Sequence, residues 1–414
     1  MTQPAVPAPQ PLAGVRVLDL SRVLAGPWCS QTLADLGAEV IKVERPGSGD
    51  DTRGWGPPYL KDGAGLDTTE AAYYLATNRN KRAITLDIAR PEGQALVRRL
   101  AADSTVFVEN FKVGDMARYG LDAPSLLALN PRLVYCSITG FGQNGPYRER
   151  AGYDYAIQAM GGLMSVTGER DGRPGGGPQK VGVAVADLFT GMYATVAILA
   201  ALRHAEATGQ GQAIDMALLD TQVAMLANLG ANYLATGSSP QRAGNAHQNV
   251  VPYQVFEAAD GHFILAVGND RQFAKFCAVA GQPELARDPR FRTNADRVRH
   301  REALIPLLLP IVAARTQADW LAALEAVQVP CGPINNLAEV FDDPQVRARD
   351  MTASLPHPLN PSGVRLVASP MKFSATPVQY RRPPPLLGQH TDEVLAELGL
   401  TAAEVATLRA QRVI

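Results

Sequence analysis

The chain of 414 residues has few cysteines, almost no net charge and no long uninterrupted apolar segment. Its 39 Lys and Arg nearly balance 40 Asp and Glu, which argues against the basic surface of a dedicated nucleic-acid-binding protein. Its four cysteines, at 29, 136, 277 and 331, form no C-x-x-C pair, so neither a disulfide framework nor a zinc site is indicated, and a reducing cytoplasm is favoured. The longest apolar run, residues 193–202, is shorter than the roughly 20 residues that cross a bilayer, so we expect a core helix and no membrane span.

Familiar catalytic signatures are missing as well. The sequence has no G-x-S-x-G elbow and no H-E-x-x-H zinc helix. Its six histidines lie apart, so their spacing predicts no metal site. Only His247, in a loop rich in glycine and asparagine, is a candidate substrate contact. Residues 1–14 lack a basic segment and an apolar segment, so we expect a disordered leader in place of a signal peptide.

The sequence has enough apolar residues, 46%, for a globular core. Strand-like runs alternate with helix-like segments at 27–36 and 91–101. Such alternation predicts βαβ units in an open parallel sheet, which binds its ligands at the carboxyl ends of the strands. The expected strands cover residues 15–20, 38–43, 82–86, 105–108 and 133–138.

A change in character near residue 230 predicts a second domain. An apolar helix over 217–234 gives way to a loop rich in Gly, Ser, Pro and Asn, and then to a hairpin that turns at Asp260 and Gly261. Several helices follow, and a Pro-rich extended tail over 330–387 precedes a last helix at 392–398. We therefore expect a large Rossmann-like α/β domain formed by residues 1–225 and 330–414, interrupted by a smaller α+β domain at 226–329.

A glycine pattern follows one expected strand. Residues 140–145 (GFGQNG) match G-x-G-x-x-G. A dinucleotide site also needs a helix that opens at the last glycine, whereas Pro146 and charged residues follow here. A glycine-rich turn is the alternative.

Several segments at strand ends are candidate phosphate contacts. The turn over residues 22–27 (RVLAGP) has small residues and a proline, which suit a ligand at a helix N-terminus. Arg45 follows Glu44 at the end of the second strand and suits a phosphorylated ribose, with a solvated ion pair as the alternative. Basic clusters at 78–82 and 112–118 suit phosphate as well, although each alone is equally typical of a solvated loop.

Asp187 is a lone acid within the apolar run VGVAVADLFTGM. A carboxylate among apolar neighbours is costly to bury unless it is paired or hydrogen-bonded. It is either the N-cap of the following helix or a nucleophile or general base at a helix N-terminus.

Taken together, and in their order along the chain, the segments described above resemble the family III CoA-transferases, and the similarity covers nearly the whole chain. The similarity includes NRNKRAITLDI, VENF, the VGVAVADLFTG block around Asp187, TGQGQAIDMALLD and the closing LLGQHTDEVLAELGL. Leu24 stands where the formyl-CoA enzymes have a glutamine, and GNAHQN at 244–249 replaces their run of glycines. The sequence is more similar to the branch that uses succinyl-CoA and dicarboxylate-type acceptors.

The resemblance implies a site. It makes Asp187 the catalytic carboxylate and gives Gly244, Asn245 and His247 to a loop near the substrate that stabilises oxyanions. The CoA contacts that it implies are Leu24, Ala25, Arg45, Asn78, Arg79, Asn80, Lys81, Asn110, Phe111, Lys112, Arg118, Arg150 and Tyr153.

The resemblance also implies an activity and an assembly. The expected partners are an acyl-CoA donor and a carboxylic acid acceptor, with coenzyme A as substrate and no metal, flavin or nicotinamide. CoA would pass through an aspartyl anhydride and an aspartyl-CoA thioester. Two ring-like chains would interlink in a homodimer. Two alternatives are a racemase of α-methylacyl-CoA type, which works through a His/Asp acid–base pair, and a non-catalytic CoA-binding protein.

Overall fold

The computed structural model describes residues 9–414. Residues 1–8, most of the leader expected to be disordered, lie outside the described residues. The chain divides into two compact units, of which the second comprises Gly162–Val181 and Leu226–Asp343. The first comprises Met1–Gly161, Gly182–Met225 and Pro344–Ile414. Residues 162–181 and 330–343, which the sequence analysis gave to the large domain, therefore belong to the second unit.

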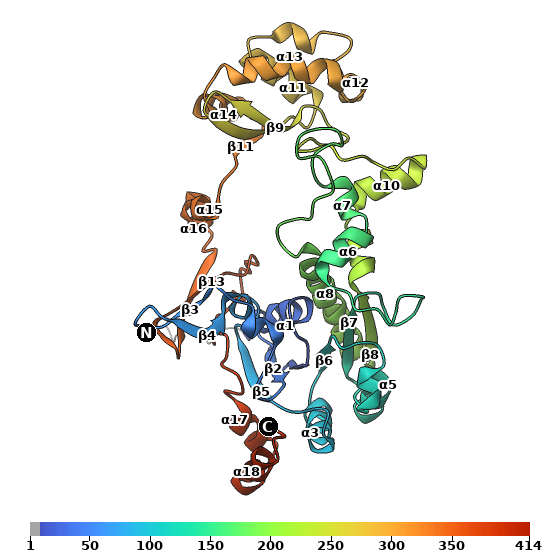
Figure 1. The fold of residues 1–414 in the computed structure, drawn as a ribbon, viewed down its shortest axis with the longest axis vertical. Coiled ribbons are helices and arrows are strands. Elements are labelled where there is room, and N and C mark those ends of the chain that lie inside the picture. The colour runs from blue at the N-terminus through green and yellow to red at the C-terminus, as the bar shows by residue number, and fades with distance from the viewer. Residues whose placement is uncertain (1–8) are drawn as a thin grey trace. The chain divides into compact units, whose positions relative to one another are not determined.

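The first unit is built on a parallel sheet of six strands (Figure 1). Numbered along the chain, the six strands lie in the order 3-2-1-4-5-6, which is the order of doubly wound dinucleotide-binding sheets. The order reverses between the first and fourth strands, and ligands bind at the carboxyl ends of strands at such a switch point. From edge to edge, the strands are β5 (Lys81–Thr85), β2 (Glu39–Glu44), β1 (Arg16–Asp19), β6 (Val106–Glu109), β7 (Val134–Thr139) and β8 (Gln212–Ala217).

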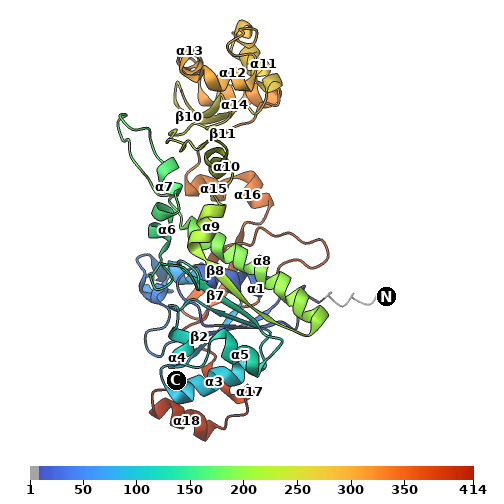
Figure 2. The ribbon, with the colours of Figure 1, turned by 90° about the vertical axis from the view of Figure 1, so that its right-hand side faces the viewer.

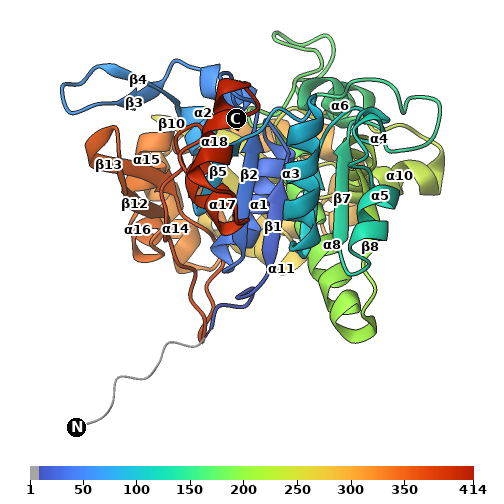
Figure 3. The ribbon, with the colours of Figure 1, turned by 90° about the horizontal axis from the view of Figure 1, so that it is seen from below.

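Helices cover both faces of this sheet, because its central strands are apolar on both sides. One face packs against α1 (Ala25–Asp35) and α8 (Val185–Thr208). The other face carries α3 (Pro91–Ala102), α5 (Ala123–Leu129), α17 (Thr391–Glu397) and α18 (Ala402–Ala410) (Figures 2 and 3).

Helix α8 contains the apolar run expected to form a core helix. It is the single helix within residues 9–414 that is long and apolar enough to cross a membrane by composition. It packs against α1, β7 and β8. Gly191 allows the close approach to α1, since a Cβ there would lie 2.6 Å from the Ala25 carbonyl oxygen. This contact sets the position of the first turn of α8 beside the first turn of α1.

The second unit has its own core. A three-stranded antiparallel sheet packs against helices around Phe263, Phe276 and Trp320 (Figure 1). The expected hairpin is present, with Ala259 and Asp260 between its strands. The strands are β9 (Tyr253–Ala258), β10 (Gly261–Ala266) and β11 (Cys331–Pro333), and the helices are α11 (Asp270–Val279), α12 (Asn294–Arg299), α13 (Arg301–Ala313) and α14 (Gln317–Ala326).

The expected strands before residue 140 and the helices α1 and α3 are confirmed, with ends shifted by one or two residues. The single helix expected over 217–234 is wrong. It is broken into α9 (Leu218–Ala224) and α10 (Ala227–Thr236), where Ala227 takes a φ of 44°. The tail over 330–387 is not simply extended, because it contains β11, two short helices and the hairpin of β12 (Thr352–His357) with β13 (Asn360–Val367).

The remaining elements are short. They are η1 (Asp51–Gly54), β3 (Tyr59–Lys61), β4 (Asp67–Ala71), α2 (Ala72–Leu75), α4 (Asp115–Arg118), α6 (Asp154–Met160), α7 (Leu163–Val166), η2 (Pro283–Ala286), α15 (Leu337–Asp342) and α16 (Pro344–Ala348).

Candidate active site

Asp187 lies in the first turn of α8, half-buried, as the third residue of the helix. It is not the N-cap, since that position is Ala184, which makes no side-chain capping bond. The capping carboxylate belongs to Asp154, whose Oδ1 accepts the backbone N–H groups of Ala186 at 2.8 Å and Asp187 at 3.4 Å. The N-cap alternative for Asp187 is therefore wrong, and its carboxylate is left available for chemistry.

Burial and the charge of Asp154 raise the pKa of Asp187 to about 7. Burial removes water from the ionised form, and a second carboxylate nearby repels it. The charge of Asp187 in turn affects the pKa of Tyr73, which lies in α2. Burial and then the charge of Asp187 raise the pKa of Tyr73 to about 12, so this phenol stays protonated beside Asp187. Sequence reasoning missed both Asp154 and Tyr73, because no local pattern connects them to α8.

Asp187 lines a cavity of about 380 Å³ within the first unit, in the size range of small-molecule sites. The walls come from the segments after β1, β6 and β7 and from residues 148–153. The cavity therefore lies at the carboxyl ends of the strands, beside the switch point. Seven of the predicted CoA contacts line it together with Asp187: Leu24, Ala25, Asn110, Phe111, Lys112, Arg150 and Tyr153.

The turn after β1 is strained and firmly held. Val23 has a φ of 70°, a left-handed conformation that costs a β-branched residue about 1–2 kcal/mol. Its N–H donates to Asp50 Oδ1 at 3.2 Å, while Lys42 Nζ donates to Asp50 Oδ2 at 2.9 Å and to the Ser21 carbonyl at 2.8 Å. Lys42 and Asp50 are buried. This ion pair fixes the turn that presents Leu24 and Ala25 to the cavity.

Asn110 joins the two sides of the switch point. Its Oδ1 accepts the N–H of Arg22 at 2.9 Å, and its Nδ2 donates to the Arg22 carbonyl at 2.7 Å. The Arg22 guanidinium lies 5.8 Å from the centroid of the Phe111 ring.

A second cavity of about 490 Å³ shares Arg22, Phe111 and Asp115 with the first and is lined by Arg45. Among residues 9–414, the exposed guanidinium of Arg45 has no recorded ion pair or hydrogen bond. Glu44, its neighbour, is occupied by Arg53, whose Nε and Nη2 each donate to it at 2.8 Å. The Glu44–Arg45 ion pair considered from the sequence is therefore absent, and Arg45 is available to an anion.

The segment Asn78, Arg79, Asn80 and Lys81 lines neither cavity. All four side chains are buried. Arg79 and Asn80 bind Asp35, while Lys81 donates to Asp19, to Asn78 and to the Pro27 carbonyl at 3.0 Å. This segment enters β5 at its amino end, whereas the cavities lie at the carboxyl ends of the strands. Its role in CoA binding stays a prediction, and its side chains would have to leave these partners to meet a ligand.

Two other predicted features lie at the edge of the site. Arg118 is exposed, pairs with Asp115 at 3.0 Å and lines neither cavity. The glycine pattern at 140–145 forms a turn with no helix at Gly145, so a dinucleotide fingerprint is excluded there. Gly140 lies against Gly152. A Cβ added to Gly140 would lie 2.6 Å from the Gly152 Cα. Both glycines line the Asp187 cavity.

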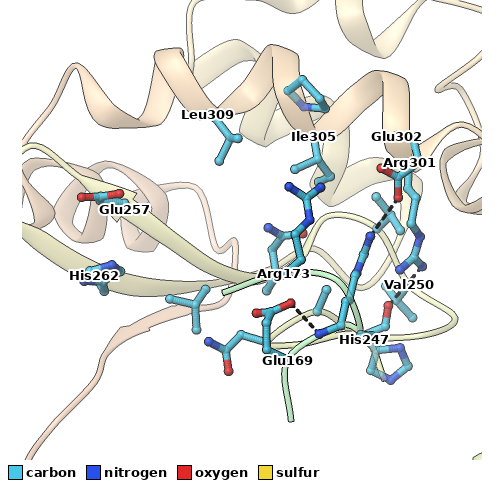
Figure 4. A pocket seen from close by; sticks show the side chains of 18 of the residues that line it. Glu169, Arg173, His247, Val250, Glu257, His262, Arg301, Glu302, Ile305 and Leu309 are labelled. Atoms are coloured by element: carbon cyan, nitrogen blue, oxygen red, sulfur yellow. Dashed lines mark hydrogen bonds and ion pairs between the residues drawn. The ribbon is translucent and has the colours of Figure 1, made fainter. Parts of the chain in front are cut away.

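The predicted substrate loop belongs to the second unit. Asn245 and His247 line a separate cavity there (Figure 4). Gly244 has a φ of 61° and its N–H donates to the Gly168 carbonyl at 3.2 Å. The His247 ring is tilted against Tyr253 with centroids 5.2 Å apart.

The family model described as CoA-transferase family III matches residues 12–391. The chain belongs to CoA-transferase family III. It is 53% identical to the succinate–glutarate CoA-transferase of Agrobacterium fabrum over 388 residues, which cover 94% of this chain and 96% of the relative. It is 44% identical to the succinyl-CoA:glutarate CoA-transferase of Homo sapiens over 389 residues, which cover 94% of this chain and 86% of the relative.

A crystal structure of a CAIB/BAIF family protein from Brucella suis is similar, with a TM-score of 0.81 and 51% identity. It covers 94% of this chain, which covers 99% of that protein. The resemblance drawn from the sequence is thus confirmed, and this family III enzyme is a CoA-transferase.

Proposed function

We propose that this enzyme transfers CoA from succinyl-CoA to a free dicarboxylic acid of the glutarate type, with Asp187 as the nucleophile. The observation that carries the proposal is a carboxylate with a raised pKa in a cavity at the switch point of the sheet. The names of the relatives, which pair succinate or succinyl-CoA with glutarate, support the choice of donor and acceptor.

The proposed chemistry is an exchange between carboxylates. The Asp187 carboxylate attacks the thioester carbonyl of succinyl-CoA, the C–S bond breaks, and CoA thiolate leaves an aspartyl–succinyl anhydride. The thiolate then attacks the aspartyl carbonyl, which releases succinate and leaves an aspartyl-CoA thioester. The acceptor carboxylate attacks this thioester, and the same two steps in reverse form the new acyl-CoA and free Asp187. Each difficult exchange is divided into easier covalent steps.

The first turn of α1 is placed to stabilise the negative charge that these steps develop. Leu24 and Ala25 line the cavity with Asp187, and the first amides of a helix have no acceptor within it. Such N–H groups bind an oxyanion or thiolate well when the site excludes water. The loop of Gly244, Asn245 and His247 stays a predicted second source of such donors.

The CoA nucleotide is assigned to the second cavity. The thioester must lie at Asp187, so the phosphates and the ribose lie farther along the connected wall formed by Arg22 and Phe111. Arg45 is available there, and Lys112 and Arg150 flank the first cavity. Guanidinium groups suit phosphate recognition because they donate two parallel hydrogen bonds.

An interlinked homodimer is part of the proposal. Helix α8 leaves an apolar stripe exposed at i, i+3, i+4 and i+7 spacing, formed by Phe189, Met192, Tyr193 and Val196 at 40–60% exposure. Contiguous exposed apolar residues on one helix face mark an interaction surface. The resemblance to the family implies that the partner on this surface is a second copy of the chain. A cytoplasmic location fits the four free cysteines of the described chain.

The racemase alternative has less support. A racemase of this kind needs a histidine paired with the acid, and among residues 9–414 no histidine lines the Asp187 cavity.

Replacement of the nucleophile tests the proposal. Asp187→Asn and Asp187→Ala should lower kcat/KM for transfer from succinyl-CoA to glutarate about 1,000-fold or more, because the covalent route is lost. Asp220→Asn, which removes an exposed acid of α9 outside the cavity, should retain wild-type activity. Undiminished transfer by the Asp187 variants would overturn the proposal.

A further inference from the structure

A buried lysine lies behind the first turn of α1. Lys81, the first residue of β5, is fully buried. Its Nζ donates to Asp19 Oδ2 at 3.2 Å, to the Pro27 carbonyl at 3.0 Å and to Asn78 Oδ1 at 2.9 Å. An ammonium group has three donors, so all of them are used inside the protein. Burial lowers the pKa of Lys81 to about 8, so the group keeps its charge at neutral pH.

Asp19, the partner of this lysine at the end of β1, accepts hydrogen bonds from both sides of the turn that follows it. Its Oδ1 accepts the N–H of Ser21 at 2.8 Å, and its Oδ2 accepts the hydroxyl of Ser30 at 2.5 Å. Ser21 precedes the turn over residues 22–26, and Ser30 lies in the second turn of α1. The ion pair of Lys81 with Asp19 is thus bonded to both ends of this turn.

The turn held in this way supplies the donors that the proposed function needs. The Trp28 N–H donates to the Leu24 carbonyl at 2.8 Å, and Pro27 has no N–H. The other amides at the start of α1 are those of Ala25 and Gly26, which have no acceptor within the helix. Pro27 follows them directly, and its carbonyl accepts from the buried ammonium group. The position of that ammonium group therefore sets the position of these two amides.

We propose that Lys81 is a positioning residue for the transfer reaction. Through Asp19 and the Pro27 carbonyl, it holds the first turn of α1 so that the first two amides of the helix meet the oxyanion formed at Asp187. This inference rests on the proposed function, in which that turn stabilises developing negative charge. It gives Lys81 a role inside the protein in place of the CoA contact that the family resemblance implies.

Loss of a positioning residue and loss of a CoA contact change different kinetic constants. In steady-state transfer from succinyl-CoA to glutarate by the purified full-length enzyme, Lys81→Met should lower kcat at least about tenfold, because a displaced donor stabilises the oxyanion poorly. The KM for succinyl-CoA should stay within about twofold of wild type. A raised KM with unchanged kcat is the result expected of a CoA contact, and it would overturn the inference.

A double variant separates positioning from stability. Lys81→Met alone leaves Asp19 buried without a cation, which destabilises the fold. Lys81→Met with Asp19→Asn removes both charges, and replacement of a whole buried ion pair is often neutral for stability. Urea denaturation should show that the double variant recovers most of the stability lost in Lys81→Met, while its kcat stays at least about tenfold below wild type. Recovery of kcat together with stability would show a purely structural ion pair and would refute the inference.

Glu397→Gln is the matched control. It removes an ion pair of Arg82, the residue after Lys81 in β5, through a contact with α17 and not with α1. Both kcat and KM should therefore match wild type in this variant.

The fate of the proposed function is read separately, from Asp187→Ala. Wild-type kcat in Lys81→Met with an inactive Asp187→Ala would refute this inference and leave the proposed function standing. Undiminished transfer by Asp187→Ala would refute the proposed function, and with it the oxyanion that Lys81 is inferred to serve.

Discussion

At the residue scale, Asp187 has two conflicting requirements. As the proposed nucleophile it must be ionised to attack a thioester, yet burial and Asp154 raise its pKa to about 7. A carboxylate that is costly to ionise is also a better nucleophile than one held by hydrogen bonds, because it is poorly solvated. If Asp187 is the nucleophile, as proposed, we expect the enzyme to work best above the pKa of this group.

The pH profile should report this directly. We expect kcat/KM to rise with pH through an acid limb near pH 7, as Asp187 ionises. Asp154→Asn keeps an oxygen that accepts the Ala186 N–H but removes the repelling charge, so the limb should move to lower pH. A limb that stays in place or moves upward would contradict this assignment.

The same pKa has a consequence for stability. A folded-state pKa above the usual 3.8 means that ionisation of Asp187 destabilises the folded state as the pH rises from about 4 to 7, by at most about 4 kcal/mol. Asp187→Asn removes this cost. Its gain in unfolding free energy over wild type should grow between pH 5 and pH 8, measured by urea denaturation. A gain independent of pH would show that the carboxylate is not the cause.

Sequence reasoning was uneven at this scale. It singled out Asp187 because a lone acid in an apolar run is conspicuous, and seven of the contacts that it predicted line the same cavity as Asp187. It missed Asp154, which reaches the site only through the fold, and it could not foresee that Arg79 and Lys81 have the internal partners Asp35 and Asp19.

At the element scale, the contact of α1 with α8 sets the site. Gly191 lies one turn beyond Asp187 and against the carbonyl of Ala25, a residue that lines the cavity. The strained turn at Val23 is held by Asp50 on the other side. Two helix N-termini are thus fixed against each other with little room for adjustment.

Gly191→Ala tests this packing. Its Cβ would lie 2.6 Å from the Ala25 oxygen and 3.2 Å from Trp28, so the helices must move apart. We expect a loss of about 1–3 kcal/mol in unfolding free energy and a drop in kcat/KM of about tenfold or more. Gly54→Ala, where nothing lies within 4 Å, is the matched control. Equal behaviour of the two variants would refute the packing argument.

Periodicity predicted the elements that are strongly apolar and failed for the others. The buried strands β1, β2 and β7 were found because parallel strands are continuous apolar runs. The break between α9 and α10 was not, because the largely apolar segment 217–234 gives no sign of the positive φ at Ala227. The hairpin β12–β13 lies among prolines that suggested an extended tail.

At the scale of the whole molecule, the exposed stripe on α8 supports association of two chains. Val196→Glu places a charge in the middle of this stripe, where Val196 is 60% exposed. We expect a dimer in wild type and a monomer, or a dimer weakened about tenfold or more, in the variant. Light scattering after size exclusion measures this. Leu129→Glu, on an isolated apolar residue of α5 with 47% exposure, should stay dimeric. A monomeric wild type would contradict the proposal.

The proposal depends most on the covalent step at Asp187. Intact-mass spectrometry of the enzyme mixed with succinyl-CoA, with no acceptor acid present, tests it most directly. We predict a species heavier by one CoA less one water, mapped to the peptide that contains Asp187, absent from Asp187→Ala and lost when glutarate is added. An unmodified mass under conditions in which the complete mixture turns over, or an adduct that persists in Asp187→Ala, would contradict the account.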